Sequence, residues 1–254
     1  MSLSSDRISG KVCVVTGAAK SIGFAIAEKY AEQGAKVVLI DIDPLVEASA
    51  KSLADKGYTA KGYVLNITNR DAVLKCFADI EATYGDIYAL VNNAGVVDVT
   101  TRVDAITLER LRRMFEVNVF GSFLCAREAV RRMSTRYGGA GGAIVNVSSA
   151  ASRLGSPGQY VDYAAAKGAI DAFTIGLAKE VGAEGIRVNA VRPGLIETEI
   201  HASGGLPNRV QDLKHLVPMQ RGGTADEVAQ AIVWLLSDAA SYTTMSLLDV
   251  SGGR

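Results

Sequence analysis

A tyrosine and a lysine four residues apart have the side-chain types that proton transfer needs. Tyr163 and Lys167 lie within residues 160–182, where the apolar spacing predicts a long helix, so both share one face of it. A phenol with its ordinary pKa of about 10 is a poor base, but a nearby ammonium favours the phenolate. Ser148 and Ser149 end the preceding predicted strand, and a hydroxyl there can hold a substrate oxygen beside the phenol. These side chains predict acid–base chemistry on an oxygen.

The first predicted strand runs into a glycine turn that suits a phosphate. Residues 11–16 are apolar, and the turn from Thr16 to Gly23 leads into the next predicted helix. Free N–H groups at such a helix start let a pyrophosphate approach, although an ordinary strand–helix turn is the alternative. Asp41 closes the second predicted strand, 36–41. A carboxylate there can accept ribose hydroxyls and repels a 2′-phosphate, or it can cap the following helix.

Small residues and amides end another predicted strand, 87–92, in the sequence Asn92-Asn93-Ala94-Gly95. The carboxyl ends of parallel strands border the ligand crevice of doubly wound sheets, whereas a plain turn is the alternative. A lone Tyr-x-x-x-Lys is usually a solvated helix face. Here the serines, the glycine turn and the amides would meet it at one sheet edge, which favours a site.

Strand-like and helix-like segments alternate along the whole chain. Strands are predicted at 11–16, 36–41, 59–65, 87–92, 143–148, 186–191 and 246–250, and helices at 22–33, 44–56, 69–84, 107–135, 160–182 and 224–237. This order implies right-handed crossovers and a parallel sheet covered on both faces. We expect an α/β, single-domain Rossmann fold over residues 1–254, with about seven strands and a flexible lead at 1–9.

Composition excludes several functional classes. The 254 residues include 27 basic and 27 acidic side chains, so the zero formal charge argues against binding to nucleic acid or an anionic membrane. No apolar run reaches the length of a membrane span, and the start lacks the apolar core of a signal peptide. Cys13, Cys76 and Cys125 are expected to be buried free thiols, which fits the cytoplasm. With two histidines and no cysteine cluster, no metal site is expected.

The combined pattern resembles the classical short-chain dehydrogenase/reductase family. The resemblance covers about Gly10 to Gly253, and it rests on Thr-Gly-x-x-x-x-x-Gly, Asn-Asn-Ala-Gly, Asn118, Ser149, Tyr-x-x-x-Lys and Pro193-Gly194. Residues 143–223 are especially similar to bacterial glucose-dehydrogenase-like and uncharacterised oxidoreductases. This likeness implies interconversion of a secondary alcohol (a sugar, polyol, cyclic or steroid-like alcohol) and a ketone, with NAD(P) carrying the hydride.

The resemblance assigns a role to each residue of the predicted catalytic group. Tyr163 would be the acid/base, and Lys167 would lower its pKa and bind the nicotinamide ribose. Ser149 would polarise the substrate carbonyl, and it is preferred to Ser148 because it precedes Tyr163 by 14 residues. Asn118, in the middle of its long predicted helix, would hold a water that links Lys167 to bulk solvent.

The cofactor contacts implied by the resemblance are Gly17, Lys20, Ser21, Ile22, Gly23, Asp41, Ile42, Asn66, Ile67, Asn93, Ala94, Gly95, Tyr163, Lys167, Pro193, Gly194, Ile196 and Thr198. Ser21 and Met245 stand where the family usually has glycine, and Asn66 replaces a common aspartate. A β-carbon at Ser21 would crowd the pyrophosphate. Lys20 lies where basic residues favour NADP, but Asp41 is the more direct ribose contact, so NAD is preferred to NADP.

Two other functions remain open: a 3-oxoacyl-(acyl-carrier-protein) reductase, and a non-catalytic dinucleotide-binding sensor or scaffold. The first would use the arginines of 107–135 to bind an acidic carrier, unless these arginines pair with neighbouring acids. A substrate lid is predicted at 195–217, and the candidate pocket residues are Arg153, Tyr160, Glu197, His201 and His215. The family likeness also implies a homo-oligomer, a dimer or tetramer, formed through helices 107–135 and 160–182.

Overall fold

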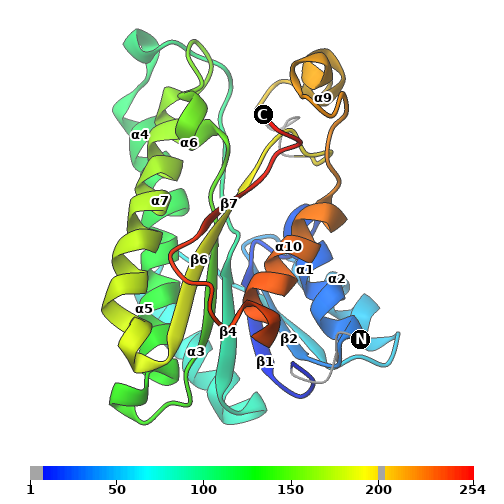
Figure 1. Cartoon of the computed structure of the whole chain (residues 1–254), viewed down its shortest axis with the longest axis vertical. Coiled ribbons are helices and arrows are strands. Elements are labelled where there is room, and N and C mark those ends of the chain that lie inside the picture. The colour runs from blue at the N-terminus through cyan, green and yellow to red at the C-terminus, as the bar shows by residue number, and fades with distance from the viewer. Residues whose placement is uncertain (1–7, 200–203) are drawn as a thin grey trace.

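The computed structural model describes residues 8–199 and 204–254, and its seven strands form one sheet (Figure 1). The strands are β1 (Val12–Thr16), β2 (Lys36–Asp41), β3 (Ala60–Val64), β4 (Ile87–Asn92), β5 (Gly142–Val147), β6 (Ile186–Pro193) and β7 (Leu247–Val250). Every neighbouring pair is parallel, in the order β3-β2-β1-β4-β5-β6-β7. The predicted seven-stranded parallel sheet is therefore confirmed. Its strand order reverses between β1 and β4, where doubly wound sheets bind their ligands.

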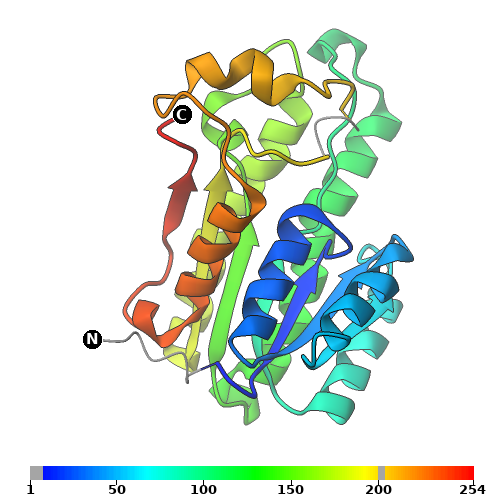
Figure 2. The same ribbon diagram turned by 90° about the vertical axis from the view of Figure 1, so that its right-hand side faces the viewer.

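Helices cover both faces of the sheet because successive strand residues point to opposite sides. Cys13 and Val15 face α1, α2 and α10, whereas Val12 and Val14 face α3, α5 and α7 (Figures 1 and 2). The helices are α1 (Ser21–Glu32), α2 (Leu45–Ala54), α3 (Arg70–Tyr84), α4 (Leu108–Phe115), α5 (Gly121–Met133), α6 (Ala151–Leu154), α7 (Val161–Val181), α9 (Arg209–Leu213) and α10 (Ala225–Leu236).

The helix predicted over 107–135 is interrupted in its middle. Residues Glu116–Phe120 form a π-helical turn between α4 and α5, and the N–H of Gly121 donates to the carbonyl of Glu116, five residues back. Asn118 lies in this turn and not in a regular α-helix as predicted. Such wide turns are rare and are frequently found at functional sites.

The first described residue and the three cysteines are buried. Ile8 is only 2% exposed and belongs to the core, whereas residues 1–7 of the lead predicted at 1–9 lie outside the described residues. Cys13, Cys76 and Cys125 are buried free thiols, as predicted, and burial raises the pKa of each. Among the described residues, no helix has the length and apolar character needed to cross a bilayer.

The predicted lid contains a short helix rather than only loop. Helix α9 and the turn Lys214–Leu216 lie above the carboxyl edge of the sheet (Figure 2). Val210 and Val217 are buried and anchor this segment. The candidate His201 lies outside the described residues.

Candidate active site

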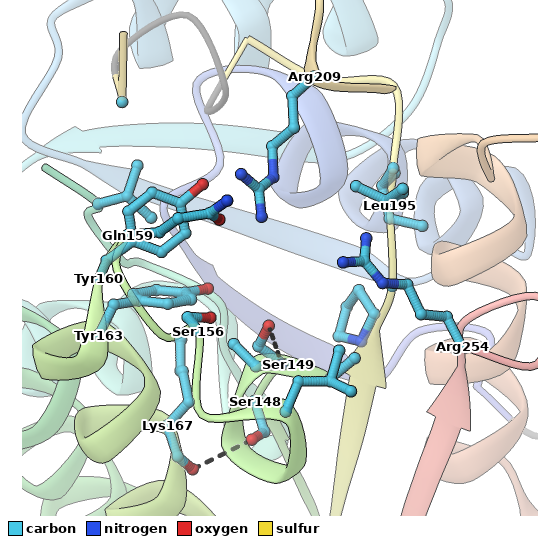
Figure 3. A pocket seen from close by; sticks show the side chains of 18 of the residues that line it. Ser148, Ser149, Ser156, Gln159, Tyr160, Tyr163, Lys167, Leu195, Arg209 and Arg254 are labelled. Atoms are coloured by element: carbon cyan, nitrogen blue, oxygen red, sulfur yellow. Dashed lines mark hydrogen bonds between the residues drawn. The ribbon is translucent and has the colours of Figure 1, made fainter. Parts of the chain in front are cut away.

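A cavity of about 460 Å³ opens at the carboxyl edge of the sheet (Figure 3). Ten residues predicted for the site line it: Ile22, Asn93, Gly95, Ser149, Tyr163, Lys167, Pro193, Gly194, Ile196 and Thr198. The other predicted positions lie outside its lining: Gly17, Lys20, Ser21, Gly23, Asp41, Ile42, Asn66, Ile67, Ala94 and Asn118. The strand ends and α7 therefore bring three of the four proposed catalytic side chains and half of the proposed cofactor contacts to one hollow.

Ser149 and Lys167 are held by backbone contacts beside Tyr163. The hydroxyl of Ser149, just after β5, accepts a hydrogen bond from the N–H of Ala151 at 3.1 Å. The Lys167 ammonium donates to the carbonyl of Val147 at 2.8 Å and lies 5.6 Å from the centre of the Tyr163 ring. The backbone thus fixes the two side chains that flank the phenol.

Ser148 has a different environment from Ser149. It is almost fully buried, and its hydroxyl donates to the backbone carbonyl of Lys167 at 3.2 Å. The Ser149 hydroxyl instead lies close enough to Tyr163 to lower the pKa of that phenol. This contrast supports the choice of Ser149 over Ser148 as the residue that would face a substrate oxygen.

Burial dominates the electrostatics of the Tyr–Lys pair. It raises the pKa of Tyr163 to about 12, against a smaller lowering by the Ser149 hydroxyl. It lowers the pKa of Lys167 to about 8, against a smaller raising by Asp171. Burial is thus the main influence on the pKa of Tyr163 in the structure, and the lowering of this pKa by Lys167 remains a prediction.

Asn118 is fully buried and fixes the segment that follows β4. Its side-chain oxygen accepts from the N–H of Val96 at 3.2 Å, and its amide donates to the carbonyl of Val96 at 3.0 Å. A β-carbon on Gly95 would lie 2.7 Å from the Asn118 oxygen and 3.4 Å from the Lys167 nitrogen. The structure thus assigns Asn118 a positioning contact; its predicted water remains a prediction.

The glycine turn is tied to the end of β4 by side-chain hydrogen bonds. The Asn93 amide donates to the carbonyls of Thr16 at 3.0 Å and Gly17 at 2.8 Å, and the Thr16 hydroxyl accepts from the N–H of Asn93. A β-carbon on Gly23 would lie 2.1 Å from the Gly17 oxygen. The Asn93 amide is therefore occupied by the loop rather than turned towards an adenosine.

Ser21 and Met245, the two departures from family glycines, both have left-handed backbones. Their φ angles are +53° and +64°. Glycine adopts this region freely, whereas a β-carbon makes it strained. Both positions therefore have a backbone conformation that favours glycine, although neither residue is a glycine.

Asp41 and Lys20 have their partners within the protein. The Asp41 carboxylate accepts from the N–H groups of Ala19 and Asp43, both at 3.0 Å, so its alternative role in capping local backbone is also met. The Lys20 ammonium lies 2.7 Å from the Glu199 carboxylate, which raises the pKa of Lys20. The acidic group at the end of β2 is thus fixed, and the nearby cation is paired.

These residues fit a nicotinamide dinucleotide. Helix α1 begins at Ser21, next to the glycine turn, and the first N–H groups of a helix have no acceptor within it. Asp41 lies beside this turn through Ala19. Of the predicted cofactor contacts after β2 and β3, Ile42 and Asn66 are exposed, whereas Ile67 is 6% exposed and would meet any β-carbon on Gly121.

Sequence reasoning missed two arginines that line the cavity. Arg209 comes from α9 and Arg254 follows β7, and neither belongs to a motif with recognisable spacing. Tyr160 lines the cavity as predicted. The other described candidates, Arg153, Glu197 and His215, do not; Arg153 pairs with Asp249 at 3.3 Å, and the other two are exposed.

The arginines of the helix predicted at 107–135 are largely paired with acids. Arg110 binds Asp162 at 2.7 Å, and Arg132 binds Glu128 at 2.9 Å. Arg113 and Arg131 also lie next to carboxylates, as do Arg102 and Arg136 just outside this range. The arginines of this helix therefore match the alternative in which they pair with neighbouring acids.

A parallel sheet with a Tyr–Lys pair at its carboxyl edge defines an oxidoreductase of the Rossmann type. A sequence model described as enoyl-(acyl carrier protein) reductase matches residues 17–254. The chain belongs to the short-chain dehydrogenase/reductase family. A solved short-chain dehydrogenase/reductase variant from Serratia marcescens is 29% identical and superposes with a TM-score of 0.89, covering 97% of this chain and 98% of that one.

Curated relatives match nearly the full length. An uncharacterised oxidoreductase, YgfF of Escherichia coli K12, is 52% identical over 96% of this chain and 99% of its own length. The cis-4-hydroxycyclohexanecarboxylate dehydrogenase of Sinomonas cyclohexanicum is 38% identical over 98% of both chains. The 3-oxoacyl-(acyl-carrier-protein) reductase FabG of Thermotoga maritima is 39% identical over 97% of this chain and 98% of its own.

Proposed function

We propose that this protein interconverts a secondary alcohol and a ketone with NAD as the hydride carrier. The observation that carries the proposal is the grouping of Ser149, Tyr163 and Lys167 at one cavity. When bound, the nicotinamide supplies or accepts the hydride, and the protein handles the proton and the orientation.

Each side chain of this group has a distinct task. The Tyr163 hydroxyl donates a proton to a carbonyl oxygen in reduction and takes one from an alcohol in oxidation. The Ser149 hydroxyl donates a hydrogen bond to the same oxygen and orients it. Lys167, held by Val147 at 2.8 Å, places a positive charge beside the ring and can bind the nicotinamide ribose. Ser149 and Tyr163 are half-buried in the cavity wall, so a bound substrate would complete the exclusion of water from the reacting oxygen.

NAD is the proposed cofactor in preference to NADP. Asp41 is held at the end of β2 by two backbone N–H groups, where it would accept ribose hydroxyls and repel a 2′-phosphate. The Lys20 ammonium is paired with the Glu199 carboxylate, which weakens the attraction of Lys20 for a 2′-phosphate. Both contacts support the same choice.

A compact secondary alcohol is the proposed substrate class. The name of the Sinomonas relative denotes a ring alcohol that carries a carboxylate. The FabG relative favours a 3-oxoacyl-(acyl-carrier-protein) substrate as the second candidate. We place it second because the arginines of α4 and α5 are paired with acids and so form a poor surface for an acidic carrier. The presence of Ser149, Tyr163 and Lys167 argues against a non-catalytic sensor.

A turnover screen with matched variants tests the function. NAD and NADP are each assayed with sugars, polyols, cyclic alcohols, hydroxysteroids and 3-oxoacyl thioesters. Tyr163→Phe should lose at least 100-fold in kcat, the order expected for loss of a general acid–base, while its Kd for NAD by calorimetry stays within about twofold. Tyr242→Phe, at a fully exposed tyrosine, is the control. Retained turnover in Tyr163→Phe would remove the proposed acid/base.

We also propose that the protein acts in the cytoplasm as a homo-oligomer, a dimer or tetramer. The buried free thiols suit a reducing compartment. Phe120 and Phe123 are about half exposed on the α5 side, and Phe123 stacks on Phe173 of α7 with ring centres 3.8 Å apart. An apolar surface of this kind suits a symmetric contact between copies. Light scattering would measure the mass, and a monomer at micromolar concentration would contradict the assembly.

A further inference from the structure

The charge of the cavity is one-sided. Three cations, Lys167, Arg209 and Arg254, line it, and no Asp or Glu is among the lining residues that the structure describes. Lys167 is engaged by Val147 and belongs to the catalytic group. The two arginines enter from the opposite wall, and their guanidinium groups point into the hollow (Figure 3). Neither is explained by the proton transfer proposed above.

Arg209 carries a buried nitrogen that has no acceptor. Its guanidinium carbon lies 5.0 Å from the centre of the Tyr160 ring, which fixes the side chain by a cation–π contact. Its Nη1 atom is buried and has no hydrogen-bond partner. A buried donor without an acceptor is costly, and buried polar groups in proteins are nearly always satisfied. The Arg209 side chain, with this unpaired Nη1 atom, points into the space that a substrate would fill (Figure 3).

Arg254 is anchored at its backbone, and its guanidinium points into the cavity (Figure 3). Its carbonyl oxygen accepts from the Arg153 guanidinium at 3.0 Å and from the Ser251 hydroxyl at 2.9 Å. Burial and the positive charge of Arg209 both lower the pKa of Arg254. Two like charges therefore face one another across the cavity. The nearby carboxylate of Asp249 is already paired with Arg153 at 3.3 Å.

We propose that Arg209 and Arg254 together bind a carboxylate of the substrate, which makes the natural substrate a hydroxy acid or oxo acid. The guanidinium fork matches a planar carboxylate. The carboxylate would supply the acceptor that the Arg209 Nη1 atom lacks and would place a negative charge between the two positive ones. This inference rests on the proposed function, because it places the reacting oxygen at Tyr163 and the carboxylate at the other end of the same cavity.

The geometry limits the length of such a substrate. The ring centres of Tyr160 and Tyr163 are 6.3 Å apart, and Arg209 lies 5.0 Å from the first ring. The guanidinium of Arg209 is therefore at most about 11 Å from the Tyr163 ring centre, which is the sum of the two separations. A few carbon atoms, as in a small ring or a short chain, span the gap between the carboxylate and the reacting oxygen.

Binding of acids that carry no alcohol for NAD to oxidise tests this site without turnover. Calorimetry would compare cyclohexanecarboxylate, benzoate and 4-oxopentanoate with their methyl esters, in the wild type and in Arg209→Met and Arg254→Met. We expect at least one acid to bind about tenfold or more tightly than its ester, and each variant to lose about 10- to 100-fold for that acid only. Arg209→Lys should lose less than Arg209→Met, and Arg112→Met, exposed on α4, should lose nothing.

The outcomes separate this inference from the proposed function. Circular dichroism confirms that each variant is folded. If no acid binds more tightly than its ester, or if both Met variants retain acid binding, the carboxylate site is refuted even where neutral secondary alcohols are oxidised. If the acids bind as expected but no alcohol or ketone is turned over, the proposed reaction is refuted and the anion site stands.

Discussion

Replacement of Ser21 by glycine should stabilise the protein, although glycine usually weakens a helix. Ser21 has φ = +53°, a conformation that costs a residue with a β-carbon roughly 1–2 kcal/mol. Glycine removes this strain but gains freedom in the unfolded chain, which offsets about 0.4–1 kcal/mol. A net gain of about 0.5–1 kcal/mol follows. For a chain of this length, that corresponds to a rise in Tm of about 1–4 °C.

Thermal unfolding of Ser21→Gly is compared with unfolding of Ser52→Gly. Ser52 is an exposed serine inside α2, where glycine should destabilise by roughly 0.5–1 kcal/mol. Both variants replace serine by glycine, but Ser21 has a left-handed backbone and Ser52 lies inside a helix. The two variants should therefore move Tm in opposite directions. A fall in Tm of Ser21→Gly equal to that of Ser52→Gly would show that the left-handed backbone stores no strain, and the reasoning would be refuted.

Four other outcomes follow from the geometry. Asp41→Ala should shift the ratio of kcat/KM for NAD over NADP at least tenfold towards NADP, and an unchanged ratio would contradict the ribose contact. Because the pKa of Tyr163 is raised to about 12, the phenolate fraction, and with it kcat/KM for alcohol oxidation, should rise up to tenfold per pH unit from pH 7 to 10; a plateau below pH 9 would contradict this. Gly95→Ala places a β-carbon 2.7 Å from the Asn118 oxygen and should destabilise by about 1–3 kcal/mol in denaturant unfolding, unless the cavity wall moves freely. Met245→Gly, at φ = +64°, should raise Tm as Ser21→Gly does, and a lower Tm would argue against strain there.

The sheet and most of its helices could be predicted because their signals are local. Short runs of β-branched residues separated by amphipathic segments identify buried parallel strands and their crossovers. The Tyr163–Lys167 pair was equally accessible, since helical spacing puts both on one face. Of the two neighbouring serines, Ser149 and not Ser148 lies near the phenol, and the catalytic role of Ser149 stays a prediction.

What the sequence missed depends on contacts between distant residues. The π-turn at Asn118 has no spacing signature, because it arises where that side chain binds Val96 of another segment. The pKa of Tyr163 follows burial, which only the packed fold determines. Arg209 and Arg254 meet across the cavity from positions 45 residues apart, with no motif to join them.

The position of Arg254 has a practical consequence for the choice of variants. Its side chain lines the cavity, and its backbone oxygen is held by Arg153 and Ser251. A substitution at Arg153 or Ser251 would therefore loosen the cavity wall without removing any group that lines the cavity near Tyr163. Kinetic constants measured on such a variant would describe an altered substrate entrance and not a lost catalytic group.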